Sequence, residues 1–100
     1  MTGPGWTFEA ELWESQHSGA WAFVTLPPEV GEDVRLLSGP PRGFGSVRVA
    51  VTVGGSTWRT SVFPDKAAGY VLPVKGAVRR REGLEVGDRV SVGLSLVTDE

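Results

Sequence analysis

The sequence predicts a mainly β protein: a small six-stranded β-barrel of the double-split type, made from a duplicated ββαβ unit with two short helices. Glycine and proline, with 14 and 7 residues, divide the chain into short segments, as a β-rich fold requires. Several segments alternate apolar and polar residues, which is the period of a half-buried strand. A Leu-Pro pair followed by a helical pattern and a valine-rich strand occurs twice, at Leu26-Pro27 and at Leu72-Pro73.

The repeat determines the domain organisation that we expect. One unit of about 45 residues is too small to bury a core alone, so two units should close around a shared core. We expect pseudo-repeats at about residues 6–53 and 57–97, in a single domain over 6–97 that follows a flexible N-terminal tail at 1–5. Because a fused duplication pairs its own strand edges, we expect a monomer.

The first repeat is expected to begin with two strands. Residues 6–13 alternate apolar and polar side chains, which predicts a half-buried strand. Its apolar face consists of Trp6, Phe8, Ala10 and Leu12. The polar residues 14–19 then turn the chain into a second strand over 21–26.

A helix and a third strand complete this repeat. Pro27 and Pro28 favour a helix start, since proline lacks only an N–H that the first turn leaves unpaired. The apolar face of this helix is Val30, Val34 and Leu37. Gly39 and the prolines after it end the helix. The glycine-rich loop 42–46 leads into the strand 47–53, whose four valines point inward.

The second repeat follows the same order. Gly54-Gly55 predicts a tight hairpin into a strand over 57–63, and the loop 64–69 leads to a short strand over 70–72. Pro73 is expected to open the second helix, which Gly83 and Leu84 end in a Schellman motif. The buried face of this helix would be Val74, Ala77, Val78 and the stem of Arg81. The last strand carries Val90, Val92, Leu94 and Leu96. We expect Val49, Val51, Val90 and Val92 in the core.

Composition argues against several functional classes. The net charge of -2 is unlike the basic excess of a general nucleic-acid binder, so nucleic acid is not an expected partner. One histidine and no cysteine provide no catalytic triad, metal cluster or cofactor fingerprint, so we expect no metal and no cofactor. The N-terminus does not resemble a signal peptide, and no apolar run suits a membrane helix, which predicts a cytoplasmic protein.

The motifs of the second half resemble the DUF1905 family, bacterial domains of unknown function. They are Gly69-Tyr70-Val71-Leu72-Pro73-Val74-Lys75, Val78-Arg79-Arg80, Gly83-Leu84 and Gly87-Asp88-Arg89-Val90. Upstream, the resemblance includes Phe8-Glu9-Ala10-Glu11-Leu12-Trp13, Trp21 to Pro27, Phe44 to Val47, Gly54 to Ser61 and Phe63-Pro64, so it covers nearly the whole chain. It implies a small closed or split β-barrel capped by short helices, and it implies no established activity.

The second half is also similar to the swapped-hairpin module of AbrB-type transition-state regulators. That similarity implies a barrel that those proteins build from two chains, and it implies DNA binding. The first repeat departs from the pattern, because residues 28–33 are acidic where a DNA-binding copy would be basic.

A basic cluster on or just after the second helix provides the first candidate site. Lys75 and Arg79 share a helical face, and Arg80 and Arg81 follow, an arrangement suited to phosphate or carboxylate. The alternative is that these cations offset the dipole at the helix C-terminus and keep the surface solvated.

The loop Arg42-Gly43-Phe44-Gly45-Ser46 provides the second candidate site. Arg42, Phe44 and the loop N–H groups could surround an anion, although the spacing matches no phosphate-binding fingerprint. The alternative is a connecting loop whose glycines serve turn geometry. His17 beside Glu14 is similarly expected to be a solvent-exposed loop residue rather than a general base.

The four tryptophans divide into two groups. Trp6, Trp21 and Trp58 are expected to fill the barrel interior or plug its ends, and the alternative is an aromatic-lined ligand pocket. Trp13 falls on the polar face of its strand, so it is expected to be exposed or to line an opening for a flat or sugar-like ligand.

We therefore expect a non-catalytic binding module or scaffold that recognises a small or anionic ligand or a protein partner. The candidate ligand-binding residues are Trp13, Arg42, Phe44, Lys75, Arg79 and Arg80. One alternative is an isomerase- or cyclase-type enzyme that orients a substrate in an apolar barrel pocket. Another is a DNA-binding regulator, by analogy with the swapped-hairpin proteins.

Overall fold

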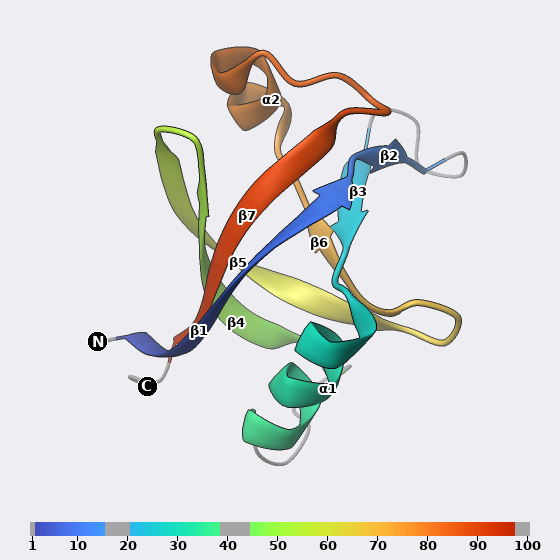
Figure 1. Ribbon diagram of the computed structural model, residues 1–100, viewed down its shortest axis with the longest axis vertical. Coiled ribbons are helices and arrows are strands. Elements are labelled where there is room, and N and C mark those ends of the chain that lie inside the picture. Colours follow the sequence, from blue (N-terminus) through green and yellow to red (C-terminus); the bar gives the residue numbers. More distant parts are fainter. Residues whose placement is uncertain (1, 16–20, 39–44, 98–100) are drawn as a thin grey trace.

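A curled, half-barrel sheet of antiparallel strands forms the body of the molecule, with a helix at each end (Figure 1). The computed structural model describes residues 2–15, 21–38 and 45–97. In these residues the strands are β1 (Thr2–Glu11), β2 (Trp13–Glu14), β3 (Ala22–Thr25), β4 (Val47–Val53), β5 (Ser56–Asp65), β6 (Gly69–Pro73) and β7 (Arg89–Val97). The helices are α1 (Pro28–Leu37) and α2 (Gly76–Glu82). The predicted mainly β class with two helices is confirmed.

The described residues form seven strands, in the spatial order β1-β7-β4-β5-β6-β3-β2, where six were expected. The additional strand arises at Leu12, where the chain changes its pairing partner from β7 to β3. The Leu12 N–H donates to the carbonyl of Asp88 at 2.9 Å, and its carbonyl accepts from Gly87 at 2.8 Å. β1 begins at Thr2, so it includes residues that we expected in a flexible tail.

The same change of partner occurs in β5. Its residues 56–62 pair with β4, whereas residues 63–65 pair with β6. The remaining ladders join β3 to β6 and β4 to β7. Two pairs of strands that we expected to be equivalent in the two repeats therefore lie side by side: β3 pairs with β6, and β4 pairs with β7.

The core lies on the concave face of this sheet. The valines expected there are buried, since Val49, Val51, Val90 and Val92 are at most 2% exposed. Strand residues from both halves join them, together with Val30 and Val34 of α1 and Val78 of α2. Trp6 and Trp58 pack partly buried against this cluster, as expected, although the indole N–H of Trp58 has no hydrogen-bond partner.

The start of α2 differs from the prediction. Pro73 lies in β6 opposite Phe23, and the helix begins only at Gly76. The N–H of Val74 donates to the carbonyl of Ala22 at 2.9 Å, so the ladder with β3 continues past the proline. Pro73 is tolerated because the ladder with β5 ends at Val71, and no strand needs its missing N–H.

The shorter helix buries less than predicted. Val78 is buried and Val74 is buried just before the helix, whereas Ala77 and Arg81 are exposed. The predicted C-terminus is confirmed: Gly83 has φ +67°, and the Leu84 N–H donates to the carbonyl of Arg79 at 2.9 Å. These two features are those of a Schellman motif.

Each helix is attached to the sheet through one carboxylate. Asp33 of α1 accepts a hydrogen bond from the Trp6 indole at 3.0 Å. Glu82 of α2 accepts one from the buried Ser56 hydroxyl at 2.6 Å and one from the Gly55 N–H at 3.3 Å. Glycine is required at the hairpin tip because Gly54 has φ +57°, and a Cβ there would also displace the Glu82 carboxylate from its present position.

We predict that Val51→Asp unfolds the protein or lowers its free energy of unfolding by more than about 4 kcal/mol, because it buries an unpaired charge. Val51 is 0% exposed. Thr52→Asp, on the exposed face of the same strand, is the matched control and should cost less than about 1 kcal/mol. Thermal and urea denaturation measure both. Equal stability of the two variants would contradict the assignment of Val51 to the buried face of β4 and of Thr52 to its exposed face.

We predict that Glu82→Ala lowers the free energy of unfolding by about 1.5–3 kcal/mol, because the charged acceptor of the Ser56 hydroxyl is lost. Glu85→Ala, at an exposed position after the same helix, should change it by less than about 0.5 kcal/mol. A double-mutant cycle with Ser56→Ala measures the coupling by urea denaturation. Strictly additive effects of the two substitutions would show that the contact stabilises nothing.

Candidate functional site

The structure brings together four of the six predicted site residues at one end of the molecule. Trp13 lies on β2, Lys75 directly precedes α2, and Arg79 and Arg80 lie in its last turn. Arg42 and Phe44 lie outside the described residues, as does His17, so those predictions remain untested.

Trp13 belongs to a row of aromatic rings on the outer face of β2 and β3. Its ring centroid lies 5.0 Å from that of Phe23, which in turn lies 6.3 Å from that of Trp21. The Trp13 indole N–H donates to the Thr25 hydroxyl at 2.9 Å, which holds the ring against the strand. Trp13 is half-buried, so it forms the inner end of the row.

Trp21 forms the outer end, and the prediction that it fills the barrel interior is wrong. Its side chain is 58% exposed. The reason is the phase of β3, in which Ala22 and Val24 face the core and their odd-numbered neighbours point outward.

The ladder between β3 and β6 brings a cation and this tryptophan to the same end of the two strands. Phe23 pairs with Pro73, and the N–H of Val74 donates to the carbonyl of Ala22. Trp21 and Lys75 are the next residues beyond this bond, so both lie where the ladder ends.

Two guanidinium groups gather next to Lys75. If Gly76 carried a Cβ, this atom would lie 3.3 Å from Nη1 of Arg80 and 3.6 Å from Nη2 of Arg79. Both arginines therefore reach back over the first residue of α2, away from the carbonyls at its C-terminus. The expectation that these two cations offset the helix dipole does not account for this arrangement, since the dipole favours cations at the opposite end.

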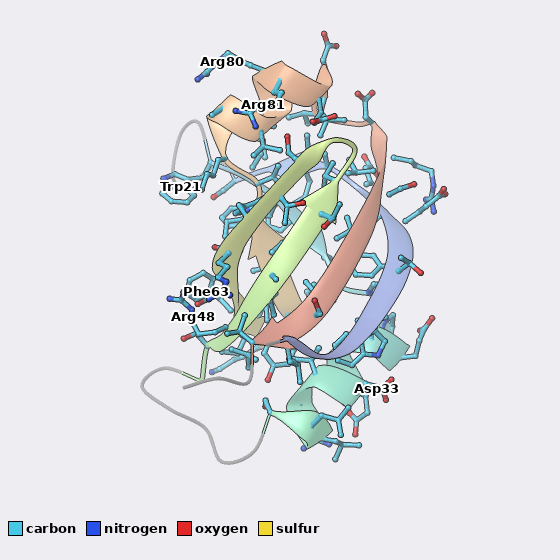
Figure 2. The ribbon with its side chains drawn as sticks, turned by 90° about the vertical axis from the view of Figure 1, so that its left-hand side faces the viewer. Trp21, Asp33, Arg48, Phe63, Arg80 and Arg81 are labelled. Carbon is cyan, nitrogen blue, oxygen red and sulfur yellow. The ribbon has the colours of Figure 1, made fainter. Side chains whose placement is uncertain are left out.

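We call Trp21, Phe23, Lys75, Arg79 and Arg80 the aromatic–basic surface. In Figure 2, Trp21 lies just below Arg80 and Arg81, and Asp33 lies near the opposite end of the molecule. Sequence reasoning missed Trp21 and Phe23 as members of this surface. The signal that could have found them is the alternation within residues 21–26, read with Ala22 rather than Trp21 facing inward.

The charges of the two ends differ. In the described part of the chain, ion pairs join Arg35 to Glu32 and Arg89 to Glu9, and neither includes Lys75 or Arg80. Glu32 raises the pKa of Arg35, first through a side-chain hydrogen bond and then through its charge. Glu32 of α1 is thus neutralised by an arginine of the same helix. Lys75 and Arg80 have no acidic partner among the residues described.

A shallow depression of about 480 Å³ lies elsewhere, on the outer face of β1, β7 and β4. Small, uncharged residues line most of it: Gly5, Thr7, Ala50, Thr52, Gly93 and Ser95. No charged or titratable side chain enters this lining, so it provides no group for chemistry or for recognition of an ion.

Two further features of the described residues bear on function. No group of three or more His, Cys, Asp or Glu residues there could hold a metal ion. None of the helices in that part of the chain is both long and apolar enough to span a membrane.

Comparison with known proteins places the chain in a family. No curated protein matches it. A family model described as a domain of unknown function, DUF1905, matches residues 8–94, which include nearly every strand and both helices. The resemblance expected from the sequence motifs is confirmed, and the chain belongs to the DUF1905 family.

Proposed function

We propose that the protein is a non-catalytic binding module that recognises a small anionic ligand at the aromatic–basic surface. The observation that carries this proposal is that Arg80 reaches back over Gly76, beside Lys75, and that neither of these two cations has an acidic partner among the residues described. Gathering like charges raises the electrostatic energy of the folded protein. A bound phosphate or carboxylate would offset that cost and form charge-assisted hydrogen bonds.

The fold supports the further proposal that the chain is an internal duplication. Two segments change pairing partner along their length. One is the segment formed by β1 and β2, and the other is β5. The Leu-Pro strands β3 and β6 pair with each other, as do the valine strands β4 and β7. If β1 and β2 are counted as one bent strand, each unit has three strands and one helix.

We predict a monomer, because both units supply the pairing partners that a single unit would need from a second chain. Size-exclusion chromatography with light scattering should give the mass of one chain across a hundredfold range of concentration. A tight dimer that persists on dilution would show that the two units do not complete the fold by themselves.

We predict that inorganic pyrophosphate binds at the aromatic–basic surface and shifts the amide NMR signals of residues 74–82. The double variant Lys75→Glu with Arg80→Glu should weaken this binding at least tenfold, because both substitutions replace an attractive charge by a repulsive one. Both side chains are exposed, so the fold should persist, which circular dichroism checks.

The matched control is Arg48→Glu with Arg59→Glu, which changes the net charge equally at two exposed positions on β4 and β5. Its affinity for pyrophosphate should stay within twofold of the parent. Equal losses in the two double variants would show that net charge, and not the aromatic–basic surface, governs binding. No binding by the parent protein would refute the proposed function.

A further inference from the structure

The row of rings on β2 and β3 ends in an open position. The planes of Trp21 and Phe23 are inclined by only 18°, so these two rings are stacked, whereas Trp13 is tilted by 31° against Phe23. Phe23 covers one side of Trp21, yet 58% of Trp21 remains exposed. A planar ring placed on the free side of the indole would extend the stack.

The same position lies next to the cations. Trp21 and Lys75 directly adjoin Ala22 and Val74, which a backbone hydrogen bond joins, and Arg80 reaches back over the neighbouring Gly76. One end of a ligand could thus lie on the indole while its anionic end meets the ammonium and guanidinium groups. Neither the aromatic nor the basic half of this surface alone would select such a ligand.

We propose that the ligand is a nucleotide-type molecule, in which a planar base stacks on Trp21 and a phosphate binds Lys75 and Arg80. This inference rests on the proposed function and assigns the chemical class of its ligand. Stacking of a base on an aromatic side chain changes binding by about 1–3 kcal/mol, or roughly five- to 150-fold. The stacked ring therefore accounts for a measurable part of the affinity, and the phosphate for the rest.

Such a ligand could be a free nucleotide or part of an unpaired nucleic-acid strand. The distribution of basic and acidic residues on the protein favours the free nucleotide. A strand needs a series of cations along its backbone, and its affinity falls steeply with salt. Here Lys75, Arg79 and Arg80 gather near Gly76, whereas α1 carries Glu29, Glu32 and Asp33. In a duplex, stacking covers the faces of the bases, so Trp21 could not reach them.

The test compares adenosine 5′-monophosphate with its two parts, adenosine and inorganic phosphate. Indole N–H signals in NMR spectra, assigned by single Trp→Phe variants, report stacking directly. The Trp21 signal should shift with the nucleotide, while that of the partly buried Trp58 should not. The nucleotide should bind at least fivefold more tightly than either part.

Trp21→Ala should remove the advantage of the nucleotide over phosphate while leaving the affinity for phosphate within twofold. The matched control is Phe63→Ala, which removes another exposed aromatic ring, 43% exposed, from β5. This control should bind the nucleotide like the parent. Equal affinities of the parent for nucleotide and phosphate would refute the stacked ring and leave the proposed anion site standing, whereas failure of both ligands to bind would refute both.

A ten-nucleotide single strand and its duplex distinguish the two sources. We expect the strand to bind no more than tenfold more tightly than the mononucleotide, and the duplex not to bind at physiological salt. A strand that bound far more tightly, with a steep salt dependence, would replace the free nucleotide by nucleic acid as the ligand. Tight binding of the duplex, weakened by Arg79→Glu and Arg80→Glu, would refute base stacking and favour the DNA-binding regulator.

Discussion

The ladder between β3 and β6 determines both the core and the candidate site. It joins the first half of the chain to the second, and its register gives every residue of both strands a face. Val24 and Leu72 point into the core, so Phe23 and its neighbour Trp21 must point outward. The bond from Val74 to Ala22 continues the ladder, and Lys75 and Trp21 are the next residues beyond it. A slip of one residue would therefore destroy the core and the aromatic–basic surface together.

The two helices use their acidic residues in ways that explain the charge distribution. Asp33 holds α1 to Trp6, and Glu32 pairs with Arg35 on the same helix. Glu82 holds α2 to the β4–β5 hairpin through Ser56. Because each of these carboxylates has a structural partner, none of them is left to neutralise Lys75 or Arg80. A net charge near zero thus conceals a local positive surface.

Sequence patterns predicted the parts of the fold that depend on local alternation and turn chemistry. The valines of β4 and β7 and the αL glycine after α2 lie where the patterns placed them. The start of α2 could not be predicted in this way, because proline favours a first helical turn, whereas a tertiary hydrogen bond at Val74 keeps the chain extended. Trp21 was misassigned because residues 21–24 are all apolar, so only the polar Thr25, which shares a strand face with Trp21, indicates which residues point outward.

The site could be predicted only as a set of residue types. Spacing indicated that Lys75 and Arg79 share a helical face, yet Lys75 precedes the helix. The cations are grouped instead by the direction of the Arg79 and Arg80 side chains, which point back toward Gly76. Long side chains in a helix lean toward its N-terminus, over the residues three and four positions earlier, so Arg79 and Arg80 both lie over Gly76. This placement follows only once the helix is known to start at Gly76. In the proposed duplication, the first unit has acidic residues in its helix where the second has these arginines. The two units would then share the task of closing the core, while only the second retained a surface that attracts anions. This division would account for the proposed anion site on a chain of net charge -2.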